Sequence, residues 1–76
     1  MSTSQEILEL SRQLTDTLAV REQLLARRRA MIIEWKRTGV KSEADSFSFV
    51  RDCIAVNEEL LRALRAELTR VRGGAA

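Results

Sequence analysis

Residues 47–71 read FSFVRDCIAVNEELLRALRAELTRV, and this stretch decides the fold. At alternating spacings of three and four residues it carries one seam of side chains: Phe47, Val50, Ile54, Asn57, Leu61, Leu64, Leu68 and Val71. A heptad pattern sustained over about three repeats is typical of a helix that lies against another helix. Asn57 is the polar member of the seam. A buried amide lowers stability but fixes the register, because a shifted pairing leaves it without a hydrogen-bond partner.

The composition of the 76-residue chain favours long helices and limits how they are stabilised. Proline is absent, and glycine occurs only at Gly39, Gly73 and Gly74. A chain this short buries only about 60% of its unfolded surface, so two helices alone are marginal. One cysteine and no histidine rule out an internal disulfide and a structural zinc site, and no cofactor motif is present. Oligomerisation or a partner protein is therefore expected to complete the core.

The chain is predicted to form a single all-α domain, an antiparallel two-helix hairpin that resembles a coiled coil. The first helix is expected over about residues 4–38, the turn over 39–42, the second helix over about 43–71, and a frayed tail over 72–76. Gly39 can adopt the left-handed conformation that ends a helix. Ser42 is a candidate N-cap of the second helix, with Asp45 completing a variant of the capping box. A turn of about four residues makes the helices antiparallel.

The simplest alignment of this hairpin places Trp35 opposite Phe47 and Leu25 opposite Asn57. Large apolar side chains then meet along the whole seam. The first helix supplies one apolar face: Ile7, Leu10, Leu14, Leu18, Leu24, Leu25, Met31, Ile32 and Trp35.

Two arginines interrupt that face. At about 100° per residue, Arg21 and Arg28 project from its centre and bracket Asn57 and Glu58 of the facing helix. Three interpretations remain open: an interhelical polar layer, a contact with a carboxylate of a partner, and an anion-binding catalytic site.

A second apolar row lies beside the seam on the second helix. Its members are Phe49, Cys53, Val56 and Leu60, at spacings of four, three and four residues. One neighbouring helix cannot cover both rows, so this row is predicted to bind a partner protein or a second copy of the chain in a four-helix bundle.

The sequence contains no recognisable catalytic constellation, and the chain is predicted not to be an enzyme. It has no histidine, no glycine-rich phosphate loop and no nucleophile beside a base. The N-terminus lacks the apolar core of a signal peptide, and no apolar run is long enough to span a membrane, so a cytoplasmic protein is expected. The net charge of +2 is mild and does not favour nucleic-acid binding.

The stretch from the end of the first helix into the second resembles the small co-chaperones of type III secretion needle subunits. Lys36, Arg37, Thr38 and Gly39 are followed by the pair Phe47 and Phe49 and then by residues 54–61, IAVNEELL. Residues 54–64 are also similar to the C-terminal helices of flagellar export chaperones. The resemblance implies a non-enzymatic protein that docks on a helical-repeat chaperone and keeps an exported subunit soluble.

Two other classes share parts of this pattern. A homodimeric four-helix bundle resembling plasmid copy-number regulators would bind RNA through a basic face with Arg27, Arg29 and Arg37. The stretch 24–28, LLARR, resembles the first helix of all-helical chorismate mutases, which implies arginines that hold a dicarboxylate. Both remain alternatives to the export chaperone.

Overall fold

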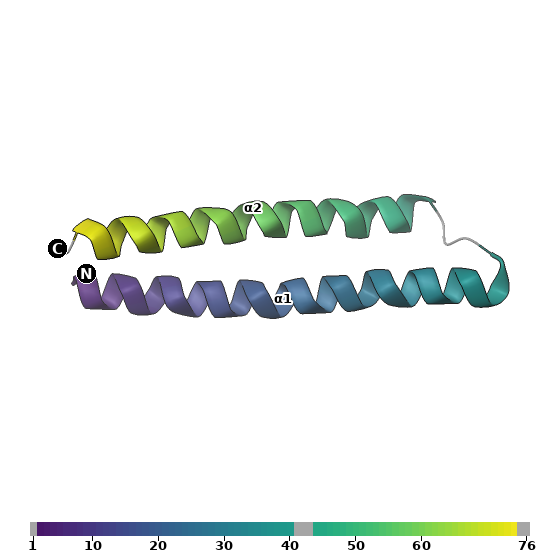
Figure 1. Ribbon diagram of the computed structural model, residues 1–76, viewed down its shortest axis with the longest axis horizontal. Coiled ribbons are helices and arrows are strands. Elements are labelled where there is room, and N and C mark those ends of the chain that lie inside the picture. Colours follow the sequence, from purple (N-terminus) through teal and green to yellow (C-terminus); the bar gives the residue numbers. More distant parts are fainter. Residues whose placement is uncertain (1, 41–43, 75–76) are drawn as a thin grey trace.

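Two long helices lie side by side and make up nearly all of the described part of the chain. The computed structural model describes residues 2–40 and 44–74, with the side chains of 44, 45 and 74 excepted. Helix α1 (Thr3–Thr38) and helix α2 (Ala44–Gly74) run antiparallel, with both chain ends at the same end of the molecule (Figure 1). The predicted all-α helical hairpin is thereby confirmed. It is a rod of 56 × 17 × 15 Å.

The ends of α1 are fixed by local hydrogen bonds. At the start, the backbone N–H of Gln5 donates to Ser2 Oγ at 3.2 Å, and that of Ser2 donates to Gln5 Oε1 at 3.1 Å, a capping box. The Ser-x-x-Gln spacing is visible in the sequence, and it places the start slightly before the expected residue 4. At the other end, Gly39 has φ 74° and donates to the carbonyl of Trp35 at 2.8 Å, as expected of a helix-ending glycine.

Helix α2 is longer than the sequence indicated. It continues to Gly74, whereas an end near residue 71 and a frayed tail were expected. Val71 is buried against α1, which anchors the last turns, and no proline follows to stop the helix. The expected cap by Ser42 and the Asp45 side chain lie outside the described residues.

The core is a single stripe of α2 pressed against α1. Phe47 and Ile54 of the seam are half-buried, and Trp35 is 43% exposed. On α1, Thr17 is buried, and most of the expected apolar face is half-buried. The seam residues that are buried are Val50, Asn57, Leu61, Leu64, Leu68 and Val71.

The alignment of the two helices differs from the expected one. The last turns of α1 extend beyond the start of α2 (Figure 1). Asn57 reaches the carbonyl of Thr17, about two turns from the expected Leu25. The buried hydrogen bond of Asn57 is made in this shifted alignment.

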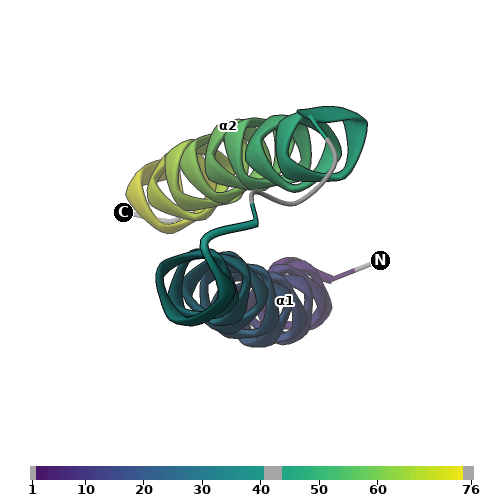
Figure 2. The ribbon, with the colours of Figure 1, turned by 90° about the vertical axis from the view of Figure 1, so that its right-hand side faces the viewer.

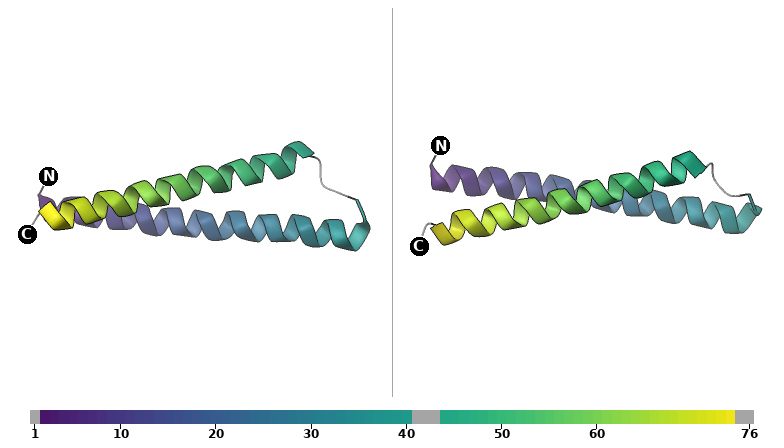
Figure 3. Two further views of the ribbon diagram at one scale, coloured as in Figure 1. Left: turned by 45° about the horizontal axis from the view of Figure 1, so that its top comes forward. Right: turned by 90° about the horizontal axis from the view of Figure 1, so that it is seen from above.

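The helices are inclined to each other. Viewed from above, they cross near the middle of the rod (Figure 3), and the end-on view shows the same inclination (Figure 2). A shallow crossing is usual for two helices packed through heptad seams. Side chains beside the seam are consequently left uncovered on the flanks of the hairpin.

Candidate functional site

The second apolar row of α2 is largely uncovered. Phe49 and Val56 are each 65% exposed, Leu60 is 49% exposed, and Cys53 is half-buried. These residues lie on one side of α2, next to the seam that faces α1. Exposure of several large apolar side chains in one row is the usual mark of an interaction surface.

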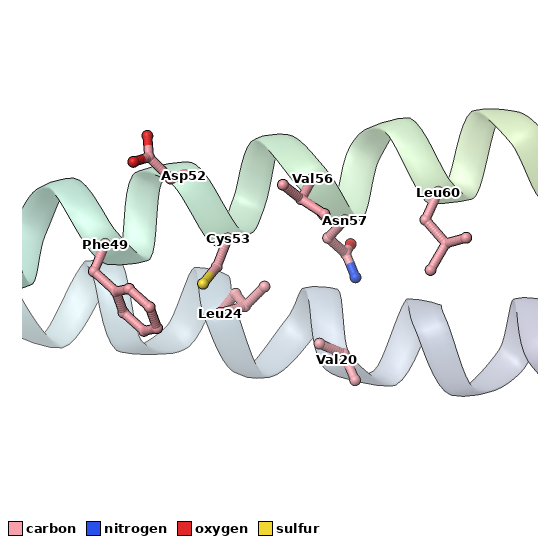
Figure 4. A pocket seen from close by; sticks show the side chains of 8 residues that line it. All are labelled: Val20, Leu24, Phe49, Asp52, Cys53, Val56, Asn57 and Leu60. Atoms are coloured by element: carbon pink, nitrogen blue, oxygen red, sulfur yellow. The ribbon is translucent and has the colours of Figure 1, made fainter.

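Two side chains of α1 complete a groove with this row. Val20 and Leu24 lie below the row, and Phe49 projects down toward α1 (Figure 4). The groove has a volume of about 410 Å³, and Asn57 also lines it. Its lining is almost entirely apolar. We call it the apolar groove, with floor residues Val20, Leu24, Phe49, Cys53, Val56 and Leu60.

Charged residues border the apolar groove. On α2, Asp52 lines its outer edge and points away from α1 (Figure 4), and Glu59 follows seven residues later on the same side of the helix. On α1, Arg27 continues the row of Val20 and Leu24 at the i, i+4, i+7 spacing. Asp52 lies 3.7 Å from Arg51, but both side chains are exposed, so this pair is weak. Arg27 and Glu59 are exposed and form no ion pair with a described residue.

The same side of the hairpin carries charged as well as apolar side chains near the chain ends. A smaller groove of about 240 Å³ there includes Glu9, Gln13, Glu67 and Arg70 in its lining. Hydrogen bonds from Arg12 and then Gln13 lower the pKa of Glu9 to about 2, and a hydrogen bond from Arg70 lowers the pKa of Glu67. Near the chain ends the lining therefore mixes charged side chains with Leu10 and Val71, whereas nearer the turn it is almost entirely apolar.

Part of the expected polar layer forms. Arg21 Nε donates to Glu58 Oε1 at 2.6 Å, with both side chains about two-fifths exposed. Asn57 Nδ2 donates to the carbonyl of Thr17 at 3.2 Å, while Asn57 Oδ1 is buried and has no partner among the described residues. Arg28 is exposed and stays outside this layer.

Thr17 also belongs to this interhelical polar layer, although the sequence pattern did not predict it. Its hydroxyl donates to the carbonyl of Gln13 at 2.6 Å, so it is satisfied inside its own helix. Continuing the spacing of three from Leu14 leads to Thr17, the position between Leu14 and Arg21 on the seam of α1. That spacing is the signal that identifies it.

The arginines do not gather into one site. Neither Arg21 nor Arg28 lines the apolar groove. Arg27, Arg28 and Arg29 are exposed, but consecutive helical residues point about 100° apart, so the three side chains spread around α1.

The described residues hold no metal-type cluster of histidine, cysteine, aspartate or glutamate side chains. Cys53 is a free cysteine. Within the described ranges, neither helix has a stretch long and apolar enough to cross a bilayer.

The chain matches no protein-family model, and no curated protein or solved structure is significantly similar to it.

Proposed function

We propose that the chain is a non-enzymatic helical adaptor that binds a partner protein through the apolar groove. The observation that carries this proposal is the contiguous, exposed row of Phe49, Val56 and Leu60, joined by two apolar side chains of α1. Such a surface favours burial of another apolar face, because removing it from water yields about 25 cal/mol per Å². Helical grooves of this kind accept amphipathic helices in many recognition systems.

The proposed setting is protein export in the cytoplasm. The resemblance to needle-subunit co-chaperones and flagellar export chaperones supports a role in which the hairpin docks on a helical-repeat chaperone, an exported subunit, or both. Export subunits that polymerise need their helical interfaces covered before assembly. A small hairpin with an open apolar groove is suited to that task.

The test compares two substitutions of equally exposed apolar residues. Phe49→Glu places a charge in the groove, whereas Ile33→Glu alters a residue that is 63% exposed and is not among the groove-lining residues. Both positions are exposed, so each change should alter the free energy of unfolding by only about 0.5 kcal/mol. We expect a partner identified by co-purification and mass spectrometry to remain bound to wild type and Ile33→Glu but to be lost from Phe49→Glu.

Circular dichroism distinguishes this result from misfolding. Unchanged helicity together with lost partner binding supports the groove as the docking site. Equal partner binding by both variants would contradict the proposal, and a loss of helicity in Phe49→Glu would assign Phe49 to the hairpin core instead.

A further inference from the structure

The charges at the borders of the apolar groove define the kind of helix that fits it. We propose that the groove binds one amphipathic helix of a partner protein with oppositely charged borders: basic residues seven apart facing α2, and an acidic residue facing Arg27. This inference rests on the proposed function and specifies its partner.

The dimensions of the floor suit a single helix. From Phe49 to Leu60 the row covers about 16 Å along α2, because a helix rises about 1.5 Å per residue. This length accepts about three turns of a partner helix. Beyond this stretch, near the chain ends, charged side chains share the lining of the second groove with Leu10 and Val71, so the almost entirely apolar floor ends there.

The two borders differ in their unpaired charges. Asp52 lines the groove on α2, and Glu59 follows two turns later on the same side of that helix. On α1, the spacing places Arg27 in line with Val20 and Leu24, whereas Asp16, one turn before Val20, is already paired with Arg12. A helix lying in the groove presents one border of its apolar stripe to each of these edges. Complementary charges at such edges steer association and select the partner.

The charges also argue against a second copy of this chain as the occupant. Two copies paired antiparallel through their α2 rows would place the edge with Asp52 and Glu59 against the same edge of the other copy. Like charges juxtaposed in this way oppose association.

Asn57 marks the inner edge of the groove. Its side chain lines the groove, the residue is only 7% exposed, and its Oδ1 has no partner among the described residues.

The inference is tested with two synthetic helical peptides that share one apolar stripe. The mixed peptide carries lysines seven apart on one border and a glutamate on the other, and the acidic peptide carries glutamates on both borders. Reversing the direction of a bound helix exchanges its borders, so the mixed peptide can always match the groove. Fluorescence anisotropy at low salt should show about five- to tenfold tighter binding of the mixed peptide, and the preference should shrink as salt is added.

A charge exchange on the protein should reverse the preference. In the variant with Asp52→Lys and Glu59→Lys both borders are basic, so the acidic peptide should bind more tightly. Ile33→Glu is the control and should keep the wild-type preference. Both exchanged residues are exposed, so the variant should fold, and circular dichroism verifies this. If the variant is unstable, the salt dependence of the peptide preference of the wild-type protein still tests the inference.

The outcomes separate the inference from the proposed function. Equal binding of both peptides, insensitive to salt and to the exchange, would overturn the charge inference while leaving the docking groove intact. Binding of neither peptide would overturn both. A dimer that neither peptide dissociates but Phe49→Glu does would show that a second copy occupies the groove, which also overturns the inference.

Discussion

At the scale of single residues, Asn57 is the polar member of the buried seam of α2. It makes one interhelical hydrogen bond, to the carbonyl of Thr17, and leaves Oδ1 without a partner among the described residues. A buried oxygen without a hydrogen bond lowers stability by about 1–3 kcal/mol. A polar residue at this place in an otherwise apolar stripe is consistent with a role in setting the register rather than in adding stability.

Replacing Asn57 with leucine should therefore stabilise the isolated chain. We expect the Asn57→Leu variant to gain about 1–2 kcal/mol in the free energy of unfolding, because it removes the unsatisfied oxygen and fills the seam with an apolar side chain. Urea unfolding followed by circular dichroism measures this change. The variant should also populate additional oligomers in size-exclusion chromatography. Reduced stability with a single unchanged species would show that the amide is fully satisfied.

Arg21 and Glu58 form the ion pair that joins α1 to α2 at the same level. Because both side chains are about two-fifths exposed, their coupling should be small, about 0.3–1 kcal/mol in a double-mutant cycle of Arg21→Ala and Glu58→Ala. The coupling should fall as salt is added. No coupling at low salt would mean that the pair does not help to fix the alignment.

At the scale of elements, α2 was the more predictable helix. Its 3-4 spacing identified the stripe that is buried, because every member of that stripe except Asn57 is apolar and periodicity reports burial directly. The buried face of helix α1 was harder to predict, because Arg21, Arg28 and Thr17 occupy the middle of that face and the apolar residues spread to either side. The relative alignment could not be derived, because it depends on the path of the turn and on side-chain contacts such as Asn57 with Thr17.

The termini of the helices also carry charge pairs that depend on pH. The pKa of Glu9 is about 2 in the folded chain against 4.5 for a free side chain, because Arg12 donates a hydrogen bond to it, and the pKa of Glu67 is lowered by Arg70. The unfolded chain therefore binds more protons below about pH 5, so stability is present above this pH and is lost as the pH falls toward 2.

We expect the midpoint temperature of thermal unfolding to decrease as the pH is lowered from 5 to 2.5. The decrease should be smaller in a variant with Glu9→Gln and Glu67→Gln. Glu22→Gln is the control, because Glu22 is exposed and forms no ion pair with a described residue. Circular dichroism melts at both pH values provide the comparison. An identical fall in wild type and the double variant would show that these carboxylates do not contribute.

At the scale of the whole molecule, the hairpin is a thin rod with one incomplete side. Phe49, Val56 and Leu60 were expected from their spacing to lie outside the seam, and they are exposed. The contribution of Val20 and Leu24 to the groove was not foreseen, because it depends on the shifted alignment and on the inclination of the helices. Sequence periodicity thus identifies the side of the groove formed by α2, and the packing of the two helices adds the side formed by α1.

The solution mass of the purified chain, measured by light scattering over a dilution series, tests directly whether the groove is vacant. The groove is proposed to be vacant until a different protein fills it, so we expect the mass of a single chain, 8.6 kDa, at the dilute end of the series. A dimer that persists unchanged on dilution would mean that self-association already covers Phe49, Val56 and Leu60. That result would contradict the proposal of an adaptor awaiting a partner helix.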